Sequence, residues 1–152
     1  MSFQELLNKL QAKGLVTESK EDLSVLNAWI EPAKIKEAVS FAKNEMGFTQ
    51  LSFVTAVDRM AENIVEVIYR LFNYETNEDI VLRVKLERAA PKVESICGLF
   101  RTADWHERET AEMFGITFLN HPDPNRLLLP DGVMAPLRKD FADADYEPLP
   151  KT

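Results

Sequence analysis

Apolar and polar positions alternate along this chain with two periods, which divide it into helices and strands. Apolar residues recur at helical spacing over residues 3–13, and again after Pro32, where a second helix is expected to end at Gly47. Between these helices the apolar run 23–30 predicts a strand that Pro32 stops. The first third of the chain is therefore expected to be a helix, a strand and a helix.

Three more strands are predicted in the middle of the chain, at residues 48–58, 64–72 and 79–86. In the last of these, apolar residues alternate strictly with charged ones, as in a sheet with one buried face. The polar segment 73–78 predicts a turn, and hence an antiparallel hairpin. The pattern favours an α+β fold, with a mostly antiparallel sheet and helices packed on one face.

Two further helices are predicted after the strands. Residues 93–100 have the spacing of a short helix. A longer, highly charged helix starts at Thr102 or Asp104, where a hydroxyl or carboxylate can cap it, and is closed by Gly115. Within it Arg108 is four residues from an acid on either side, close enough to form ion pairs.

The last part of the chain reads as an extended arm. Six of the eight prolines lie between residues 122 and 150, which excludes long helices and central strands there. The same stretch nevertheless carries many large apolar side chains: Leu127, Leu128, Leu129, Val133, Leu137, Phe141 and Tyr146. We therefore expect an α+β domain at 1–115 and an arm at 116–152, much of which lies on a partner. The alternative, a loop folded back over its own sheet, suits residues 121–130 better than the end.

Charge and composition narrow the classes of partner. The net charge of -7 disfavours broad contact with nucleic acid or anionic lipid. The single cysteine, Cys97, gives no internal disulfide and no reason to expect secretion. The N-terminus lacks the pattern of a signal peptide, and no apolar run approaches the roughly 18 residues of a transmembrane helix. We expect a cytoplasmic protein that reaches a membrane only through a partner.

Catalytic and cofactor chemistry has little support in the residues present. One cysteine and two histidines cannot supply the four ligands that an iron–sulfur cluster normally needs. The chain has no Gly-x-Gly-x-x-Gly, no Walker loop and no nucleophile elbow. We therefore expect no cofactor and no catalytic site on this chain.

One alternative remains open, an independent metal-dependent enzyme. Its ligands would be His106, Glu109 and Glu112 from the charged helix, with His121 folding back to join them. Two histidines and two carboxylates suit zinc or iron. The competing interpretation is that these charges are solvated or are paired with a partner.

A series of short motifs carries a family resemblance. The run Glu107-Arg-Glu-x-x-Glu-Met-Phe-Gly is followed by His121-Pro-Asp, Arg126-Leu-Leu and Pro136-Leu-Arg-Lys-Asp-Phe. In this order they resemble the signature of the respiratory-chain NADH dehydrogenase 30 kDa subunit family, which includes related subunits of energy-converting membrane-bound [NiFe] hydrogenases. The α+β organisation of residues 15–100 is similar to the N-terminal domain of that family.

The resemblance implies a non-catalytic scaffold subunit in the peripheral arm of a complex I-related membrane redox complex, peripheral on the cytoplasmic side of the membrane. Its expected partners are the large subunit, which lines the quinone or nickel–iron site, and the small subunit, which bears a cluster. NADH dehydrogenase and hydrogenase complexes both remain open. The residues expected to bind these partners are Glu107, Arg108, Glu109, Glu112, His121, Arg126, Arg138, Lys139, Asp140 and Phe141.

Overall fold

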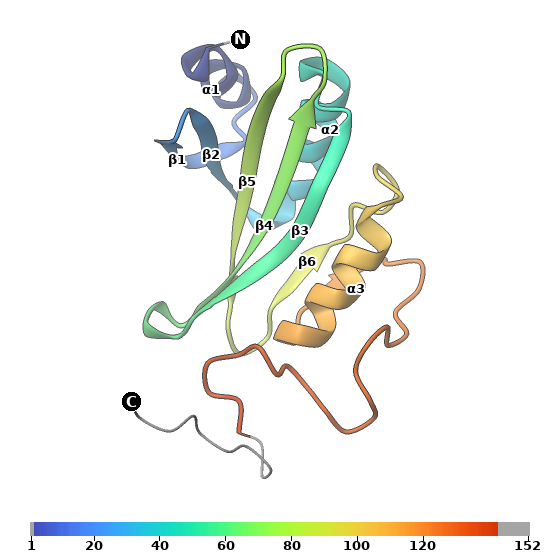
Figure 1. The fold of residues 1–152 in the computed structure, drawn as a ribbon. Helices are drawn as coiled ribbons and strands as arrows, with labels where there is room; N and C mark the ends of the chain where they lie inside the picture. The colour runs from blue at the N-terminus through green and yellow to red at the C-terminus, as the bar shows by residue number, and fades with distance from the viewer. Residues whose placement is uncertain (1, 143–152) are drawn as a thin grey trace, which may run out of the picture.

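The computed structural model describes residues 2–142 and contains a five-stranded sheet, a two-stranded sheet and three α-helices (Figure 1). The elements are α1 (Phe3–Ala12), β1 (Val16–Asp22), β2 (Val25–Ile30), α2 (Ile35–Met46), β3 (Gln50–Arg59), β4 (Ile64–Asn73), β5 (Glu78–Glu87), β6 (Lys92–Glu94), α3 (Ala103–Phe114) and β7 (Thr117–Leu119). Short 3-10 turns at Pro32–Lys34 and Met60–Glu62 precede α2 and β4. None of the helices in this part of the chain is long and apolar enough to cross a bilayer.

The large sheet has the strand order β1-β2-β5-β4-β3. Three of its four pairings are antiparallel, and only β2 and β5 run parallel. The β4–β5 hairpin turns through the polar segment that the sequence marks as a turn. The predicted α+β fold with a mostly antiparallel sheet is confirmed.

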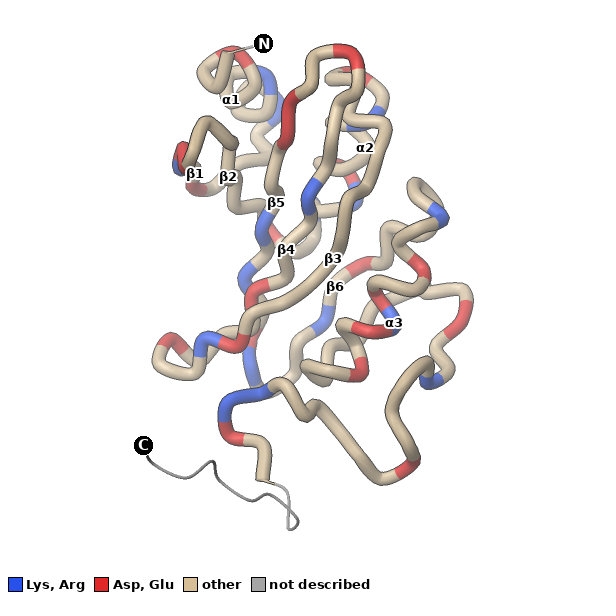
Figure 2. The backbone as a smooth tube through the Cα atoms, in the orientation of Figure 1, with Lys and Arg blue, Asp and Glu red and all other residues tan. Residues whose placement is uncertain are grey.

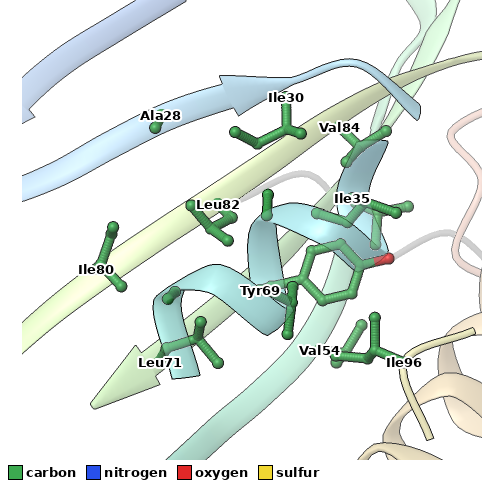
Figure 3. Close-up of a cluster of buried hydrophobic side chains, with 14 of the residues drawn as sticks. Ala28, Ile30, Ile35, Val54, Tyr69, Leu71, Ile80, Leu82, Val84 and Ile96 are labelled. Carbon is green, nitrogen blue, oxygen red and sulfur yellow. The ribbon is translucent and has the colours of Figure 1, made fainter. Parts of the chain in front are cut away.

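The hydrophobic core lies between the large sheet and the helices that cover one of its faces (Figures 1 and 3). Alternate residues of β4 and β5 point into this core, as the two-residue period of a strand requires. In Figure 3 Tyr69 and Leu82 lie against α2, whose Ile35 is fully buried. Helix α2 ends at Gly47, whose φ of 79° is left-handed, which confirms the predicted glycine stop.

Two predicted elements near the start of the chain change in the structure. The predicted strand 23–30 is shorter and begins at Val25, because Leu23 and Ser24 form a turn with φ values of 48° and 64°. The turn connects β2 to β1, which the sequence did not predict. Strand β1 is an exposed sheet edge rich in charged residues, so it lacks the apolar alternation on which the prediction of strands depends.

The prediction of a short helix at residues 93–100 is wrong. This segment contributes strand β6 and then a turn, in which the N–H groups of Leu99 and Phe100 both donate to the carbonyl of Ile96. Strand β6 pairs in parallel with β7, which lies in the segment that the sequence assigned to the arm. The described remainder of the arm, residues 120–142, contains turns and irregular backbone.

Candidate functional site

Helix α3 lies between the edge of the large sheet and the arm (Figure 1). It joins the edge strand β3 through the hydroxyl of Thr110, which donates to the carbonyl of Val54 at 3.2 Å. Ala103 and Phe114 anchor its two ends in the core. The predicted side-chain cap is not made, since Thr102 forms no capping hydrogen bond. Charged residues are frequent along α3 (Figure 2), and Glu107, Arg108 and Glu112 form hydrogen bonds with the loop after β6 or with the arm.

Glu107 is fully buried and holds the loop that follows β6. Its carboxylate accepts hydrogen bonds from the Ser95 hydroxyl at 2.6 Å and the Ile96 N–H at 2.8 Å, and from the Cys97 thiol at 3.1 Å. Burial raises the pKa of Glu107 above its ordinary value, although these hydrogen bonds counteract the shift. The bonds give a physical reason for the irregular backbone where a helix was predicted.

His121 of the arm packs against α3, and its side chain is only 5% exposed. Its Nε2 lies 3.2 Å from the carbonyl oxygen of Asp104 and 3.7 Å from a carboxylate oxygen of Glu107. Its Nδ1 accepts the N–H of Asp123 at 3.0 Å. The neutral ring therefore carries its proton on Nε2, where it faces oxygen acceptors.

The four residues of the predicted metal site do not form one group. Among the described residues, the ligand atoms of Cys97, Glu107 and His121 lie within 4.8 Å of one another. A metal bound to Nε2 of His121 would require the proton on Nδ1, but that atom accepts the N–H of Asp123. Burial also raises the pKa of the Cys97 thiol to about 12, which disfavours the thiolate that a metal needs. These contacts are more typical of a hydrogen-bonded structural cluster than of a metal centre.

Glu112 holds the middle of the arm by its main chain. Its carboxylate accepts the N–H groups of three consecutive residues, Leu127, Leu128 and Leu129, the last two at 2.9 and 3.2 Å. Burial alone would raise its pKa, but these three donors outweigh it and hold the pKa of Glu112 below its usual range. Because three consecutive N–H groups bind one carboxylate, the backbone of residues 127–129 is held in one position relative to α3.

Arg108 and Arg126 bind main-chain carbonyls of the arm. Arg108 donates to the carbonyls of Asn125 and Arg126 at 3.1 and 3.2 Å and lies 3.4 Å from the Asp123 carboxylate. It pairs with the arm instead of with the acids four residues away on its own helix. Arg126 donates to the carbonyls of Pro130 and Val133, both at 2.8 Å, and so closes the next turn.

The arm returns to α3 at the end of the helix. The Nε of Arg138 donates to the carbonyl of Phe114 at 2.7 Å, and the N–H groups of Ala135 and Leu137 donate to carbonyls in the last turn of α3. The closing Gly115 has a φ of 70°, and a Cβ there would lie 3.4 Å from the side chains of Ala135 and Arg138. Glycine is therefore favoured by the left-handed backbone conformation, whereas a Cβ would only reach van der Waals contact with the arm.

The end of the described arm is held by an ion-pair cluster that the sequence did not predict. Arg88 binds Asp58 through two hydrogen bonds of 2.7 and 2.8 Å and Asp140 through two of 2.6 and 3.1 Å. The N–H of Lys139 also donates to Asp58 at 2.8 Å. The Arg88 guanidinium lowers the pKa of the almost fully buried Asp58 to about 2.

The side chains that point outward form a different set. Glu109 and the side chain of Lys139 are exposed and make no ion pair with any residue in the described range. The exposed large apolar side chains in residues 120–142 are Leu128 (60%), Met134 (71%), Leu137 (56%) and Phe141 (39%). Thus most of the predicted partner-binding charges are engaged within the chain, whereas apolar side chains of the arm face outward.

The fold and site together define an α+β domain whose C-terminal arm is fixed to one charged helix. A family model described as respiratory-chain NADH dehydrogenase, 30 Kd subunit, matches residues 28–147. The chain belongs to this family.

Relatives and solved structures agree with this assignment. The chain is 35% identical to a subunit of the F(420)H(2) dehydrogenase of Methanosarcina mazei over 118 residues, which cover 76% of this chain and 75% of that protein. It is 38% identical to a subunit of the NADH-quinone oxidoreductase of Roseiflexus sp. over 127 residues, covering 81% and 71%. Its fold matches the trypsin-resistant fragment of Nqo5 with a TM-score of 0.69 and 25% identity, covering 81% of this chain and 99% of the fragment. A chain of the membrane-bound sulfane sulfur reductase, an archaeal respiratory membrane complex, matches with a TM-score of 0.80 and 23% identity, covering 91% and 85%.

Proposed function

We propose that this chain is a non-catalytic scaffold subunit in the peripheral arm of a complex I-related membrane redox complex. One observation carries the proposal: the arm is held in place by polar contacts with its own domain, and its large apolar side chains are left facing outward. Exposed apolar side chains on a fixed segment are typical of a protein interface. The arm is thus ordered before it docks, which reduces the entropy lost on binding.

Two partners fit this proposal. The first is the large subunit that lines the quinone or nickel–iron site, and the second is the small subunit that bears the nearby cluster. The relatives described above carry dehydrogenase and oxidoreductase names, which favours a dehydrogenase complex over a hydrogenase. In either complex the chain would lie peripherally on the cytoplasmic side of the membrane, held there by its partners.

The residues of the site have two different roles in this proposal. Arg108, Glu112 and Arg138 are half-buried and shape the arm, whereas the buried Glu107 shapes the loop after β6. Leu128, Met134, Leu137 and Phe141 contact the partner, with Glu109 and Lys139 available for ion pairs at the rim. Rim charges mainly set the rate and specificity of docking, whereas buried apolar anchors carry most of the affinity.

Co-purification of the full-length chain with the large subunit of the same organism tests the docking. The double variant Leu128→Ser and Leu137→Ser is expected to reduce recovery of the complex at least tenfold, because both side chains are exposed in the free chain and buried on docking. Leu23→Ser is the matched control, since Leu23 is 93% exposed at the turn between β1 and β2. Undiminished recovery of the double variant would rule out the arm as the docking surface.

We also propose that the chain carries no redox centre or metal of its own. Elemental analysis and the absorption spectrum of the purified chain check this directly. The observation in favour is the hydrogen-bonding state of His121, whose Nε2 faces carbonyl and carboxylate oxygens as a donor. Stoichiometric zinc or iron that is lost in His121→Ala would instead support the metal-dependent enzyme.

A further inference from the structure

A cavity separates the arm from α3. After β7 the backbone of the arm bows away from α3, with the side chains of Arg108 and Glu112 spanning the gap, and it meets the helix again at Ala135 (Figure 1). The space enclosed in this way has a volume of about 290 Å³. Its floor includes Ala111 and Phe118, and Val133 and Met134 line it from the arm.

The charged side chains around this cavity are already engaged with the chain itself. Arg108 binds two carbonyls of the arm, Glu112 binds three N–H groups, and His121 is hydrogen-bonded through both ring nitrogens. A polar ligand would therefore find few free partners there, and burying its own polar groups unpaired would be unfavourable. The chemistry of the cavity selects an apolar occupant.

Size and position identify the kind of occupant. Pockets for small-molecule ligands usually have roughly 300–1,000 Å³, so 290 Å³ lies at the bottom of that range and suits one large side chain. Met134 lines the cavity and is also 71% exposed, so the cavity opens onto the apolar surface of the arm. Side chains that fill pockets at the centre of an interface usually dominate its affinity.

We propose that this cavity is a socket for one aromatic or large aliphatic side chain of the partner on which the arm docks. The inference rests on the proposed function and adds the chemistry of the contact. One such side chain of the large subunit enters the cavity between α3 and the arm. The contacts of Arg108, Glu112 and Arg126 hold the socket open before the partner arrives.

Two measurements test the socket, and the first needs no partner. Roughly 150 Å³ of apolar cavity is enough to bind benzene, so indole should bind the isolated full-length chain with saturable NMR shifts at the methyl groups of Ala111, Val133 and Met134. Ala111→Phe fills the cavity and should abolish these shifts. The matched control is Ala12→Phe on the exposed face of α1. Absence of saturable shifts in the wild type would overturn the proposal.

The second measurement is the affinity for the large subunit. Ala111→Phe should weaken it at least tenfold, while Ala12→Phe leaves it unchanged. Affinity within twofold of the wild type in the Ala111→Phe chain would overturn the socket. If that variant does not fold, Val133→Phe fills the same space from the arm and is read in the same way.

Two other outcomes point elsewhere. Failure of the wild-type chain to bind the large subunit, with indole still bound, would overturn the proposed docking and with it the partner as occupant. A concentration-dependent dimer of the isolated chain that Ala111→Phe abolishes would identify a second copy as the occupant and overturn the proposal in its present form.

Discussion

The Nε of Arg138 lies 2.7 Å from the carbonyl oxygen of Phe114, so a residue of the arm caps the C-terminus of α3. A cation is favoured at this end of a helix, where the carbonyls carry partial negative charge. Arg138→Ala should lower the free energy of unfolding by about 1 kcal/mol, from the lost hydrogen bond and the lost charge. Amide hydrogen exchange should also quicken at Ala135 and Leu137, which donate to the last turn of α3. Lys139→Ala is the control, because it keeps the N–H that binds Asp58; equal effects of both changes would contradict the capping role.

The pair of Arg88 and Asp58 makes stability depend on pH. The folded-state pKa of Asp58 is about 2, below its ordinary 3.8, so the unfolded chain takes up the proton first as pH falls. The stabilisation from this pair is complete above about pH 5 and is lost between about pH 4 and pH 2, by about 2 kcal/mol.

Urea denaturation of wild type and Asp58→Asn over this pH range checks that sign. The variant should be several kcal/mol less stable at pH 7, since it leaves the largely buried Arg88 with one partner fewer. Its stability should also change less with pH below about pH 4. Asp131→Asn in an exposed turn serves as the control. A wild-type curve that is flat in this window would show that the pair does not form.

Glu112 and Glu109 provide a comparison on one helix. Glu112→Gln should loosen the arm, because an amide replaces the charge and turns one acceptor oxygen into a donor facing the N–H groups of Leu127 to Leu129. We expect faster amide exchange at these three residues and a loss of about 1.5–3 kcal/mol, as for hydrogen bonds to a charged group. Glu109→Gln, which is exposed, should change neither. If amide exchange at Leu127 to Leu129 in the Glu112→Gln chain stayed as slow as in the wild type, the Glu112 carboxylate would not be what holds this segment.

Tyr69 offers a test of the core. Its hydroxyl is buried and has no hydrogen-bond partner among the described residues, and burial raises its pKa well above the ordinary value. Removing an unpaired buried hydroxyl is favourable, so Tyr69→Phe should leave the free energy of unfolding unchanged or raise it by about 1 kcal/mol. A loss above about 1 kcal/mol in equilibrium denaturation would mean that the hydroxyl has a partner, such as a buried water.

The elements that the sequence predicted well are those with strong local signals. Helix α2 has Pro32 at the start of the 3-10 turn that leads into it, a 3.6-residue apolar period and Gly47 at its end, and each signal acts within a few residues of chain. Strand β1 lacked such signals, and residues 93–100 carried a helical spacing that the structure does not follow. The first is a charged sheet edge, and the second takes its shape from Glu107, which lies on a later helix.

The sequence located the candidate site but did not predict which residues its side chains contact. The family motif on α3 identified Glu107, Arg108 and Glu112, yet their partners come from segments 10 to 18 residues away in sequence. Arg108 is an example of a contact that spacing does not reveal. Two acids lie four residues from it on the helix, but its guanidinium binds carbonyls of the arm instead. Asp58 and Arg88 had no local signal at all, because the third member of their cluster lies 52 residues after Arg88.

The cluster of Asp58, Arg88 and Asp140 also has a consequence for the order of synthesis. Asp58 and Arg88 emerge from the ribosome long before Asp140, so their ion pair can form before the end of the arm has been made. The contact between Arg88 and the arm forms only after Asp140 has been translated. A prematurely terminated chain would thus lack both the closing carboxylate and the shaped docking surface. Docking through the arm, as proposed above, would then discriminate against chains that end before Asp140.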